Sequence, residues 1–336
     1  MGSEQVRLTP KAARKLIFEA LTGAGTAPAN ATYFTEAILD TELSGLEGHG
    51  FYWLQYYCEH VASGKVDGKA KPSVKKLSPV AFRVDAKRGF AHPAIEKGFE
   101  KLIPAAQKSG IAGLAVHNSY NAATLGYHTG TLARHGLVAF GFTNSTPAIA
   151  PVGGKRPLVG TNPLSFAVPG KAGKIAFLID QSSSAVAWTA VKRAAEEGRA
   201  IPLGWALDEE GKPTTDPNRG LEGSMAPSGG YKGFGQGLIV EVMCAALAGA
   251  LRGPQMGSFM ANDGKPIGCG QFFIAIAPDR FSGGQFTKQI AALAKSIIAQ
   301  QGARLPNARR AANQKRLAKE GLPIDQALHD RLQSFA

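Results

Sequence analysis

Hydrophobic positions recur at helical spacing at the start of this chain and change to strand-like runs further along. Apolar residues three or four apart predict helices over residues 9–21, 30–43 and 51–62. Thr9, followed by proline, is a typical helix start. The polar stretch of residues 64–72 then predicts a linker.

The middle of the chain alternates short apolar runs, typical of strands, with segments of helical spacing. The predicted strands cover residues 81–84, 111–116, 137–142, 164–168, 175–179 and 272–276, and the predicted helices cover residues 93–109, 122–134, 185–196, 235–251 and 284–301. Residues 198–230, rich in proline and glycine, predict a loop. From residue 307 onward the pattern is helical again, so a mixed α/β middle lies between two helical ends.

Composition predicts a globular protein of two or three domains, since 44% of the 336 residues are apolar and 19% charged. The three cysteines, Cys58, Cys244 and Cys269, form no CxxC pair, which disfavours a disulfide framework and a thiolate zinc site. The sequence opens without the pattern of a secretory leader, and its longest apolar run, residues 237–251, is too short to cross a bilayer. We therefore expect a cytoplasmic protein that binds no membrane.

The formal net charge of +13 favours an anionic partner. The densest group of cations, residues 304–319, has helical spacing and contains no aromatic residues that would stack on bases. A nucleic acid is therefore a poor candidate, and an anionic small molecule is a better one.

Common enzyme motifs are absent from the sequence. It has no GxxxxGK[ST] loop, and residues 233–237 lack the third glycine and the preceding strand of a GxGxxG motif. It also has no HExxH and no GxSxG motif. His117, His128 and His135 lack the spacing of metal ligands, so we expect no metal.

Two segments have the composition of a binding site. In Gly48-His49-Gly50, an imidazole that titrates near neutral pH lies between residues that allow close backbone approach, and a helix-capping role is the alternative. Residues 159–166 form a polar loop that enters a strand, where both ligand contacts and ordinary turns are common.

With these segments, the chain resembles the type 2 malate/L-lactate dehydrogenase family, which is unrelated to the Rossmann dehydrogenases. This family includes L-sulfolactate and ureidoglycolate dehydrogenases, diketogulonate reductases and Δ1-piperideine-2-carboxylate/Δ1-pyrroline-2-carboxylate reductases. The resemblance spans nearly the whole chain, and its motifs are residues 45–50, 62–69, 144–145, 159–163, 179–180, 230–233 and 304–306.

The resemblance implies an α/β (α+β) fold that binds NADH or NADPH on a mostly antiparallel sheet without a GxGxxG loop. It implies a helical domain made of residues 1–70 and 301–336, a mixed cofactor- and substrate-binding region over residues 71–300, and a homodimer. Family members transfer hydride between the nicotinamide and the α-carbon of a 2-hydroxy or 2-oxo acid or of a cyclic imino acid.

The resemblance also assigns roles to residues. Proton transfer falls on His49, because the reaction needs a donor whose pKa lies near the working pH. Substrate contacts are expected at Gly48, Trp53 and Thr161. The expected cofactor contacts are Asn121, Ala122, Ala123, Thr124, Leu125, Asp180, Gln181, Ser182, Tyr231, Lys232, Asn307, Ala308 and Arg309.

Three positions depart from the family pattern. Gly48 stands in place of a serine, Asn121 in place of a histidine, and Trp53 in place of an arginine that pairs with the substrate carboxylate. Without that bidentate cation, malate, which has two carboxylates, is a poorer substrate. The aromatic residues of segment 52–57 favour an aromatic-walled pocket, with helix packing as the alternative.

We therefore expect reduction of Δ1-pyrroline-2-carboxylate or Δ1-piperideine-2-carboxylate to L-proline or L-pipecolate. The alternative is a 2-oxo acid/2-hydroxy acid dehydrogenase that acts on malate, L-lactate, ureidoglycolate or a similar acid. NADH and NADPH are not distinguished, because Arg309 and Arg310 suit a 2′-phosphate but are equally typical of a solvated surface.

Overall fold

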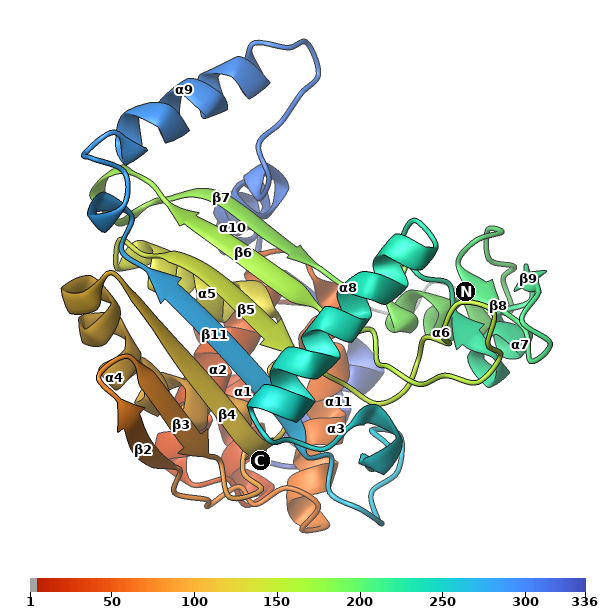
Figure 1. The fold of residues 1–336 in the computed structure, drawn as a ribbon. Coiled ribbons are helices and arrows are strands. Elements are labelled where there is room, and N and C mark those ends of the chain that lie inside the picture. Colours follow the sequence, from red (N-terminus) through yellow and green to blue (C-terminus); the bar gives the residue numbers. More distant parts are fainter. Residues whose placement is uncertain (1–4) are drawn as a thin grey trace.

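A seven-stranded sheet forms the centre of the computed structural model, in which residues 5–336 are described (Figure 1). Its strand order is β2-β3-β4-β11-β5-β6-β7, and all neighbours are antiparallel except β3 and β4. The strands are β2 (Ser73–Ser78), β3 (Ala81–Asp85), β4 (Ile111–Ser119), β5 (Val138–Thr143), β6 (Leu164–Pro169), β7 (Ile175–Gln181) and β11 (Cys269–Ile276). The expectation of a mixed α/β fold with a mostly antiparallel sheet is confirmed.

Helices cover both faces of this sheet. One face packs against α4 (Ala91–Ser109) and α5 (Leu125–Arg134), and the other against α8 (Tyr231–Glu241) and its π-helical continuation η3 (Val242–Leu247). Successive apolar side chains of β11 point to opposite faces of the sheet, so both faces need helices packed on them. Phe273 and Ala275 join the core under α4 and α5, whereas Phe272 and Ile274 pack towards α8 and η3.

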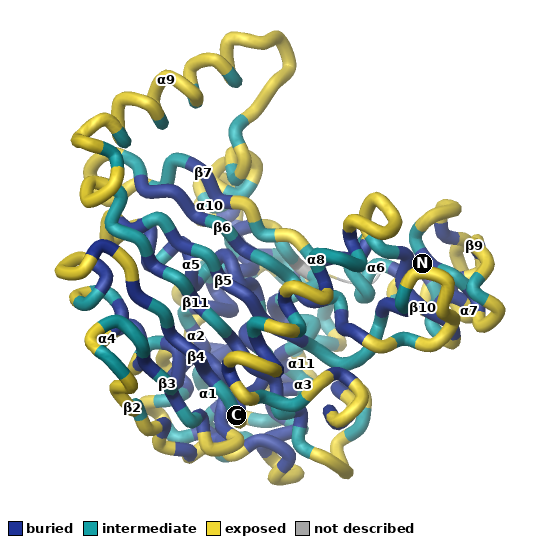
Figure 2. The backbone as a smooth tube through the Cα atoms, in the orientation of Figure 1, coloured by how far each residue is buried: buried dark blue, intermediate teal, exposed yellow. Residues whose placement is uncertain are grey.

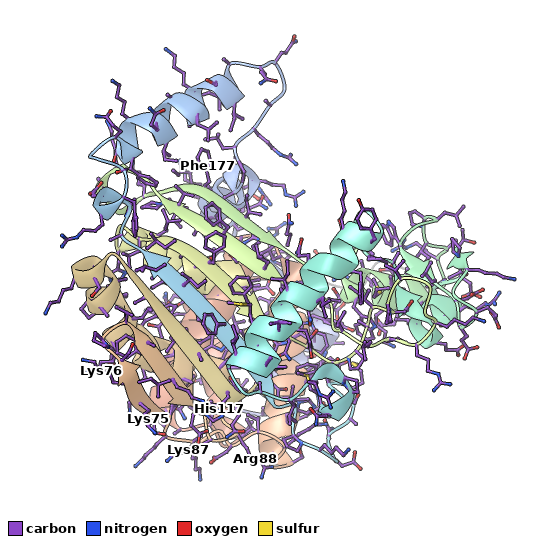
Figure 3. The ribbon with its side chains drawn as sticks, in the orientation of Figure 1. Lys75, Lys76, Lys87, Arg88, His117 and Phe177 are labelled. Atoms are coloured by element: carbon purple, nitrogen blue, oxygen red, sulfur yellow. The ribbon has the colours of Figure 1, made fainter. Side chains whose placement is uncertain are left out.

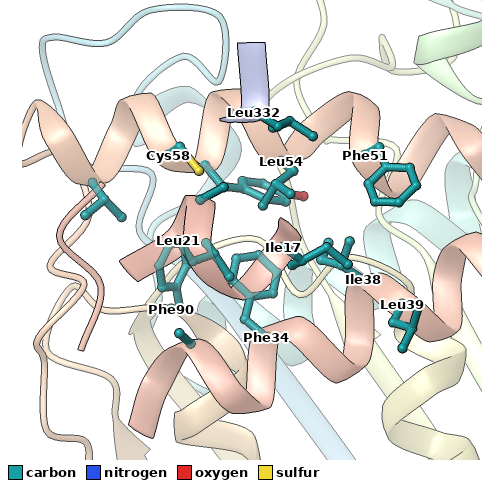
Figure 4. Packing of buried hydrophobic residues seen from close by; sticks show 14 of the residues in the cluster. Ile17, Leu21, Phe34, Ile38, Leu39, Phe51, Leu54, Cys58, Phe90 and Leu332 are labelled. Atoms are coloured by element: carbon teal, nitrogen blue, oxygen red, sulfur yellow. The ribbon is translucent and has the colours of Figure 1, made fainter. Parts of the chain in front are cut away.

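Both ends of the described chain meet in a helical unit. It contains α1 (Pro10–Gly23), α2 (Pro28–Leu43), α3 (Phe51–Ala62), α10 (Ala308–Glu320) and α11 (Gln326–Gln333). Two short strands, β1 (Gln5–Leu8) and β12 (Leu322–Asp325), pair antiparallel. Figure 4 shows the shared core, where Leu332 of α11 lies near Leu54 and Cys58 of α3.

Residues between β7 and α8 form a small lobe beside the sheet, at the right of Figure 1. It contains α6 (Trp188–Glu196), α7 (Pro217–Glu222) and a sheet of order β10-β8-β9, made of β8 (Ala206–Leu207), β9 (Pro213–Thr214) and β10 (Ser224–Met225). Its own core includes Val191, Ile201 and Met225. The prediction of a loop over residues 198–230 was therefore wrong, because two-residue strands leave no periodicity to detect.

Several predicted boundaries shift. The helix predicted over residues 122–134 begins only at Leu125, because Ala123 has a φ of 51° and its N–H donates to the Asn121 side chain at 2.6 Å. The helix predicted from residue 185 begins at Trp188, and the one predicted over residues 235–251 runs from Tyr231 to Leu247, including η3. The predicted helix 284–301 is α9 (Phe286–Ile298).

The segment predicted as a linker, residues 64–72, is not a free connection, because Lys65 and Val66 are both buried. Figure 2 shows how burial follows the sheet and the helical unit, while α9 is exposed along its length. No helix in the described residues is long and apolar enough to cross a membrane.

Part of the positive charge lies along one edge of the sheet (Figure 3). Lys75 and Lys76 are exposed on the edge strand β2, and Lys87 and Arg88 are exposed in the turn after β3. Charged side chains on an edge strand prevent pairing with another sheet. This cluster therefore has a structural explanation that requires no nucleic acid.

Candidate active site

A cavity of about 940 Å³ lies where β4, β5 and β7 end and β6 begins, next to the helical unit and the lobe. Eleven of the residues predicted for substrate, cofactor or catalysis line it: His49, Trp53, Asn121, Ala123, Thr124, Leu125, Thr161, Asp180, Gln181, Ser182 and Arg309. The chain segments that supply them are far apart in the sequence, so the fold brings the predicted site together.

Six predicted residues are not among the described residues that line this cavity: Gly48, Ala122, Tyr231, Lys232, Asn307 and Ala308. Tyr231 and Lys232 are exposed at the start of α8, and Tyr231 borders a second hollow of about 250 Å³. Asn307 precedes α10 with a φ of 76° and acts as its N-terminal flanking residue. For these six residues, a direct cofactor or substrate contact remains a prediction.

His49 lies between two glycines whose backbones are closely approached by side chains of α6 and α2. It ends the short helix η1 (Glu47–His49). A β-carbon at Gly48 would lie 2.9 Å from Thr189 Oγ1, and one at Gly50 would lie 1.9 Å from Glu42 Oε1. Glu42 Oε1 in turn accepts the N–H of Phe51 at 2.5 Å, which caps the start of α3. The glycines therefore bring α2 and α6 against the segment that carries the imidazole.

The electrostatic environment of His49 sets its acidity. Burial lowers the pKa of the imidazole below its ordinary value, the nearby Asp180 carboxylate opposes this shift, and the Arg310 guanidinium adds to it. The imidazolium form is therefore a stronger acid than free histidine, a property suited to giving up a proton.

Asp180 connects three parts of the cavity wall. Its Oδ2 accepts the backbone N–H of Gly126 at 3.0 Å, in the first turn of α5, and both terminal nitrogens of Arg310 at 3.3 Å. A β-carbon at Gly126 would lie 2.9 Å from that oxygen, so only glycine leaves room for the carboxylate. The Asp180 side chain is 9% exposed and thus mostly desolvated.

The loop that carries Thr161 is organised by its neighbour Asn162, which is fully buried with a φ of 39°. The Asn162 side chain accepts the N–H of Ser145 at 3.1 Å and donates to Gly237 O and to Glu241 Oε2, both at 2.9 Å. Glu241, which interrupts the longest apolar run of the sequence, is thus a hydrogen-bond partner inside the fold.

A segment over residues 256–260 forms another part of the cavity wall, and Lys65 holds it in place. The Lys65 ammonium donates to the carbonyl oxygens of Ser258 at 2.6 Å and Asp263 at 2.9 Å, and also to that of Ala261. Burial lowers the pKa of Lys65, and Asp263 opposes this shift. The supposed linker therefore shapes the cavity.

Aromatic rings form the side of the cavity next to His49. Trp53 packs edge-on against Phe259 of the 256–260 segment, with ring centroids 6.2 Å apart. Among the aromatic residues of segment 52–57, only Trp53 lines the cavity, while Tyr57 is buried in the core. The segment therefore contributes both to an aromatic pocket wall, through Trp53, and to helix packing, through Tyr57.

Some lining residues were not predicted. They include Arg310, which pairs with Asp180, Thr189 of the lobe, and Met256, Phe259 and Met260 of segment 256–260. The sequence suggests only a 2′-phosphate as a partner for Arg310 and gives no indication of its ion pair with Asp180. Thr189 lies at the start of α6 and the residues of segment 256–260 lie in an irregular segment, and neither sequence contains a motif.

The main sheet is mostly antiparallel and has no phosphate-binding glycine loop, and its strand ends border a cavity lined by His49, Asp180 and two arginines. This is the arrangement of a non-Rossmann dehydrogenase. The chain belongs to the malate/L-lactate dehydrogenase family, which matches residues 8–333. It is an NAD(P)-dependent oxidoreductase.

Two relatives and one solved structure illustrate the range of this family. A (2R)-3-sulfolactate dehydrogenase (NADP(+)) from Chromohalobacter salexigens is 40% identical over 96% of both chains. A Δ1-pyrroline-2-carboxylate reductase from Ancylobacter novellus is 37% identical over 99% of this chain and 98% of the relative. The crystal structure of Δ1-piperideine-2-carboxylate reductase from Pseudomonas syringae is 33% identical and superposes with a TM-score of 0.92 over 98% of this chain and 100% of that one.

Proposed function

We propose that this enzyme uses NADPH or NADH to reduce a cyclic imino acid with one carboxylate, Δ1-pyrroline-2-carboxylate or Δ1-piperideine-2-carboxylate, to L-proline or L-pipecolate. The observation that carries this proposal is the Trp53–Phe259 wall next to His49. A planar, mostly apolar ring gains contact with such a wall, whereas a second carboxylate buried there without a cation would lose its hydration.

The charge of the cavity supports a substrate with a single carboxylate. Arg309 and Arg310 are the two Lys or Arg residues among the described residues that line it. Arg310 is paired with Asp180, and both arginines come from the start of α10 rather than from the segments around Trp53.

The residues that α10 and the start of α5 contribute to the cavity fit a dinucleotide. The start of α5 already binds the Asp180 carboxylate through the N–H of Gly126, and Arg309, at the start of α10, supplies a cation suited to a cofactor phosphate. A cavity of about 940 Å³ is at the large end of small-molecule sites, which span roughly 300–1,000 Å³. When bound, the nicotinamide supplies the hydride.

His49 then completes the reaction. As hydride adds to the carbon of the C=N bond, the electron pair of that bond moves to nitrogen, which takes a proton from the His49 imidazolium. The product is a secondary amine, and the imidazole is left neutral. If the substrate binds with its imine nitrogen already protonated, the rate depends less on proton donation by His49.

A substrate panel tests the proposal. We expect kcat/KM with NADPH or NADH to be higher for Δ1-pyrroline-2-carboxylate than for oxaloacetate or pyruvate, because the aromatic wall offers no partner to a second carboxylate. The oxidation of (2R)-3-sulfolactate with NADP⁺ is measured alongside, since a relative of 40% identity is named for it.

Trp53→Arg is the matched variant of this panel. It is expected to shift the ratio of kcat/KM towards oxaloacetate, since an arginine at this position supplies a bidentate partner for a carboxylate. A ratio of pyrroline-2-carboxylate to oxaloacetate below one in the wild type would contradict the imino acid proposal and favour a 2-hydroxy acid dehydrogenase.

We also propose that the enzyme is a homodimer. In Figure 1, α8 lies across the outside of the sheet and α9 stands away from the body. Both elements expose a series of apolar side chains, and such patches are typical of interfaces. The exposed apolar residues on α8, η3 and α9 include Leu238, Ile239, Val242, Leu247, Leu293 and Ile298.

Charges in this surface are expected to separate the subunits. The double variant Ile239→Asp/Val242→Asp should elute as a monomer of 35.2 kDa in light scattering, while the wild type elutes at twice that mass. Leu203→Asp is the matched control, because Leu203 is 68% exposed but lies in the lobe. A monomeric wild type would contradict the dimer.

A role in proline metabolism within the cytoplasm follows from the proposed reaction. It agrees with the three cysteines, all of which are free and buried, as expected in a reducing compartment.

A further inference from the structure

A residue of the lobe occupies the side-chain volume that Gly48 leaves empty beside His49. A β-carbon at Gly48 would lie 2.9 Å from Thr189 Oγ1 and 3.7 Å from Thr189 Cβ. Thr189 is the second residue of α6, and it lines the same cavity as His49 and Trp53. A hydroxyl group thus stands next to the imidazole segment, although residue 48 itself has no side chain.

This hydroxyl is available to a ligand. Among the other hydroxyl groups of the cavity wall, Thr124 bonds to Thr41 at 2.8 Å and Ser182 bonds to Ser184 at 3.0 Å, whereas those of Thr146 and Ser228 make no hydrogen bond within the described residues but do not lie against Gly48. Thr189 Oγ1 has no hydrogen-bond partner in the described part of the chain, and the side chain is half-buried. Its position at the wall leaves the donor free to point into the cavity.

The charges around the cavity indicate what the Thr189 hydroxyl can bind. A carboxylate bound beside the Trp53 ring needs hydrogen-bond donors; Arg310 is already paired with Asp180, and Arg309 is the cation assigned above to the cofactor. We propose that the Thr189 hydroxyl donates a hydrogen bond to the substrate carboxylate and so determines which acids the enzyme accepts. The inference rests on the proposed function, because it assumes a substrate with a single carboxylate next to His49.

Variants at position 189 test it. Thr189→Val keeps the shape of the side chain but removes the hydroxyl, and it is expected to raise KM for Δ1-pyrroline-2-carboxylate about 10- to 100-fold, the usual effect of losing a hydrogen bond to a charged group. Thr189→Ser keeps the hydroxyl and should remain within about threefold of the wild type in KM, on the same argument. In both variants, the Kd for NADPH should not change.

Transfer of the hydroxyl is a second test. In Gly48→Ser/Thr189→Ala, the serine at position 48 enters the volume vacated by the threonine side chain, so the double variant should have a lower KM than Thr189→Ala alone. A Thr189→Val variant with the KM of the wild type would overturn the inference, as would a Thr189→Ser variant as impaired as Thr189→Val.

Binding of pyrrole-2-carboxylate, a planar acid with one carboxylate, separates this inference from the proposed reaction. The calorimetric Kd of this acid is expected to rise in Thr189→Val but not in Thr189→Ser, whichever acid the wild type reduces. A wild type that does not reduce cyclic imino acids would refute the proposed function alone. Equal Kd values for the wild type and Thr189→Val would refute the role of Thr189.

Discussion

His49→Ala is expected to lower kcat for imino acid reduction by about 10²–10⁴-fold, the usual size of a general-acid contribution. The physical reason is that nitrogen gains an electron pair as hydride arrives, and His49 lines the same cavity as Trp53 and lies within electrostatic reach of Asp180. Steady-state kinetics with saturating NADPH measure the change. Because the side chain acts in the chemical step, the Kd for NADPH should stay nearly the same.

The pH profile separates a proton donor from a structural role of His49. Burial lowers the pKa of the imidazole below the ordinary 6.5, so the protonated donor is lost as pH rises through that lowered value. Reduction by the wild type should therefore fall with rising pH in this range, and the reverse oxidation should rise. The His49→Ala variant should lose this dependence. Turnover of the variant at the rate of the wild type would contradict the assignment and leave His49 as a helix cap.

Asn162→Ala is expected to lower the free energy of unfolding by about 2–4 kcal/mol, because each buried polar group that loses a hydrogen bond destabilises the fold by about 1–3 kcal/mol. Three groups lose a hydrogen bond: the N–H of Ser145, the carbonyl of Gly237 and the carboxylate of Glu241, which keeps the N–H of Gly253 as a partner. The φ of 39° adds to the loss, because alanine tolerates this region less well than asparagine.

Urea denaturation monitored by circular dichroism measures this change. Asn218→Ala is the matched control, because Asn218 is exposed on α7, and such substitutions usually stay within about 0.5 kcal/mol. KM for the substrate should also rise in Asn162→Ala, because Thr161 belongs to the same loop. An unfolding free energy equal to that of the control variant would show that the Asn162 network does not stabilise the loop.

The sequence predicted six of the seven strands of the main sheet but missed β2. Runs such as the one in β11 are strongly apolar because both faces are covered, and this pattern is visible without a structure. Strand β2, with Lys75 and Lys76, is exposed at the sheet edge and has no apolar run. The pairing of β1 with β12 could not be predicted from the sequence either, because it joins segments at opposite ends of the chain.

The family motifs located much of the candidate site but not its internal contacts. Asp180 was predicted as a cofactor contact from its motif, yet its partner Arg310 is 130 residues away. Lys65 was assigned to a linker, although its ammonium holds the wall that carries Phe259. Such contacts depend on how two irregular segments meet, and local residue patterns contain no information about this.

The sequence by itself determined the family, most helices and the six apolar strands of the main sheet, and the position of His49 between two glycines. These features depend on short-range patterns: the period of apolar residues, the turn residues and the family motifs. The tertiary structure alone decided that Gly48 makes room for Thr189, that Gly126 makes room for Asp180, and that Trp53 meets Phe259. Each of these is a close approach between distant segments, and its energy arises only when packing excludes water and brings the partners together.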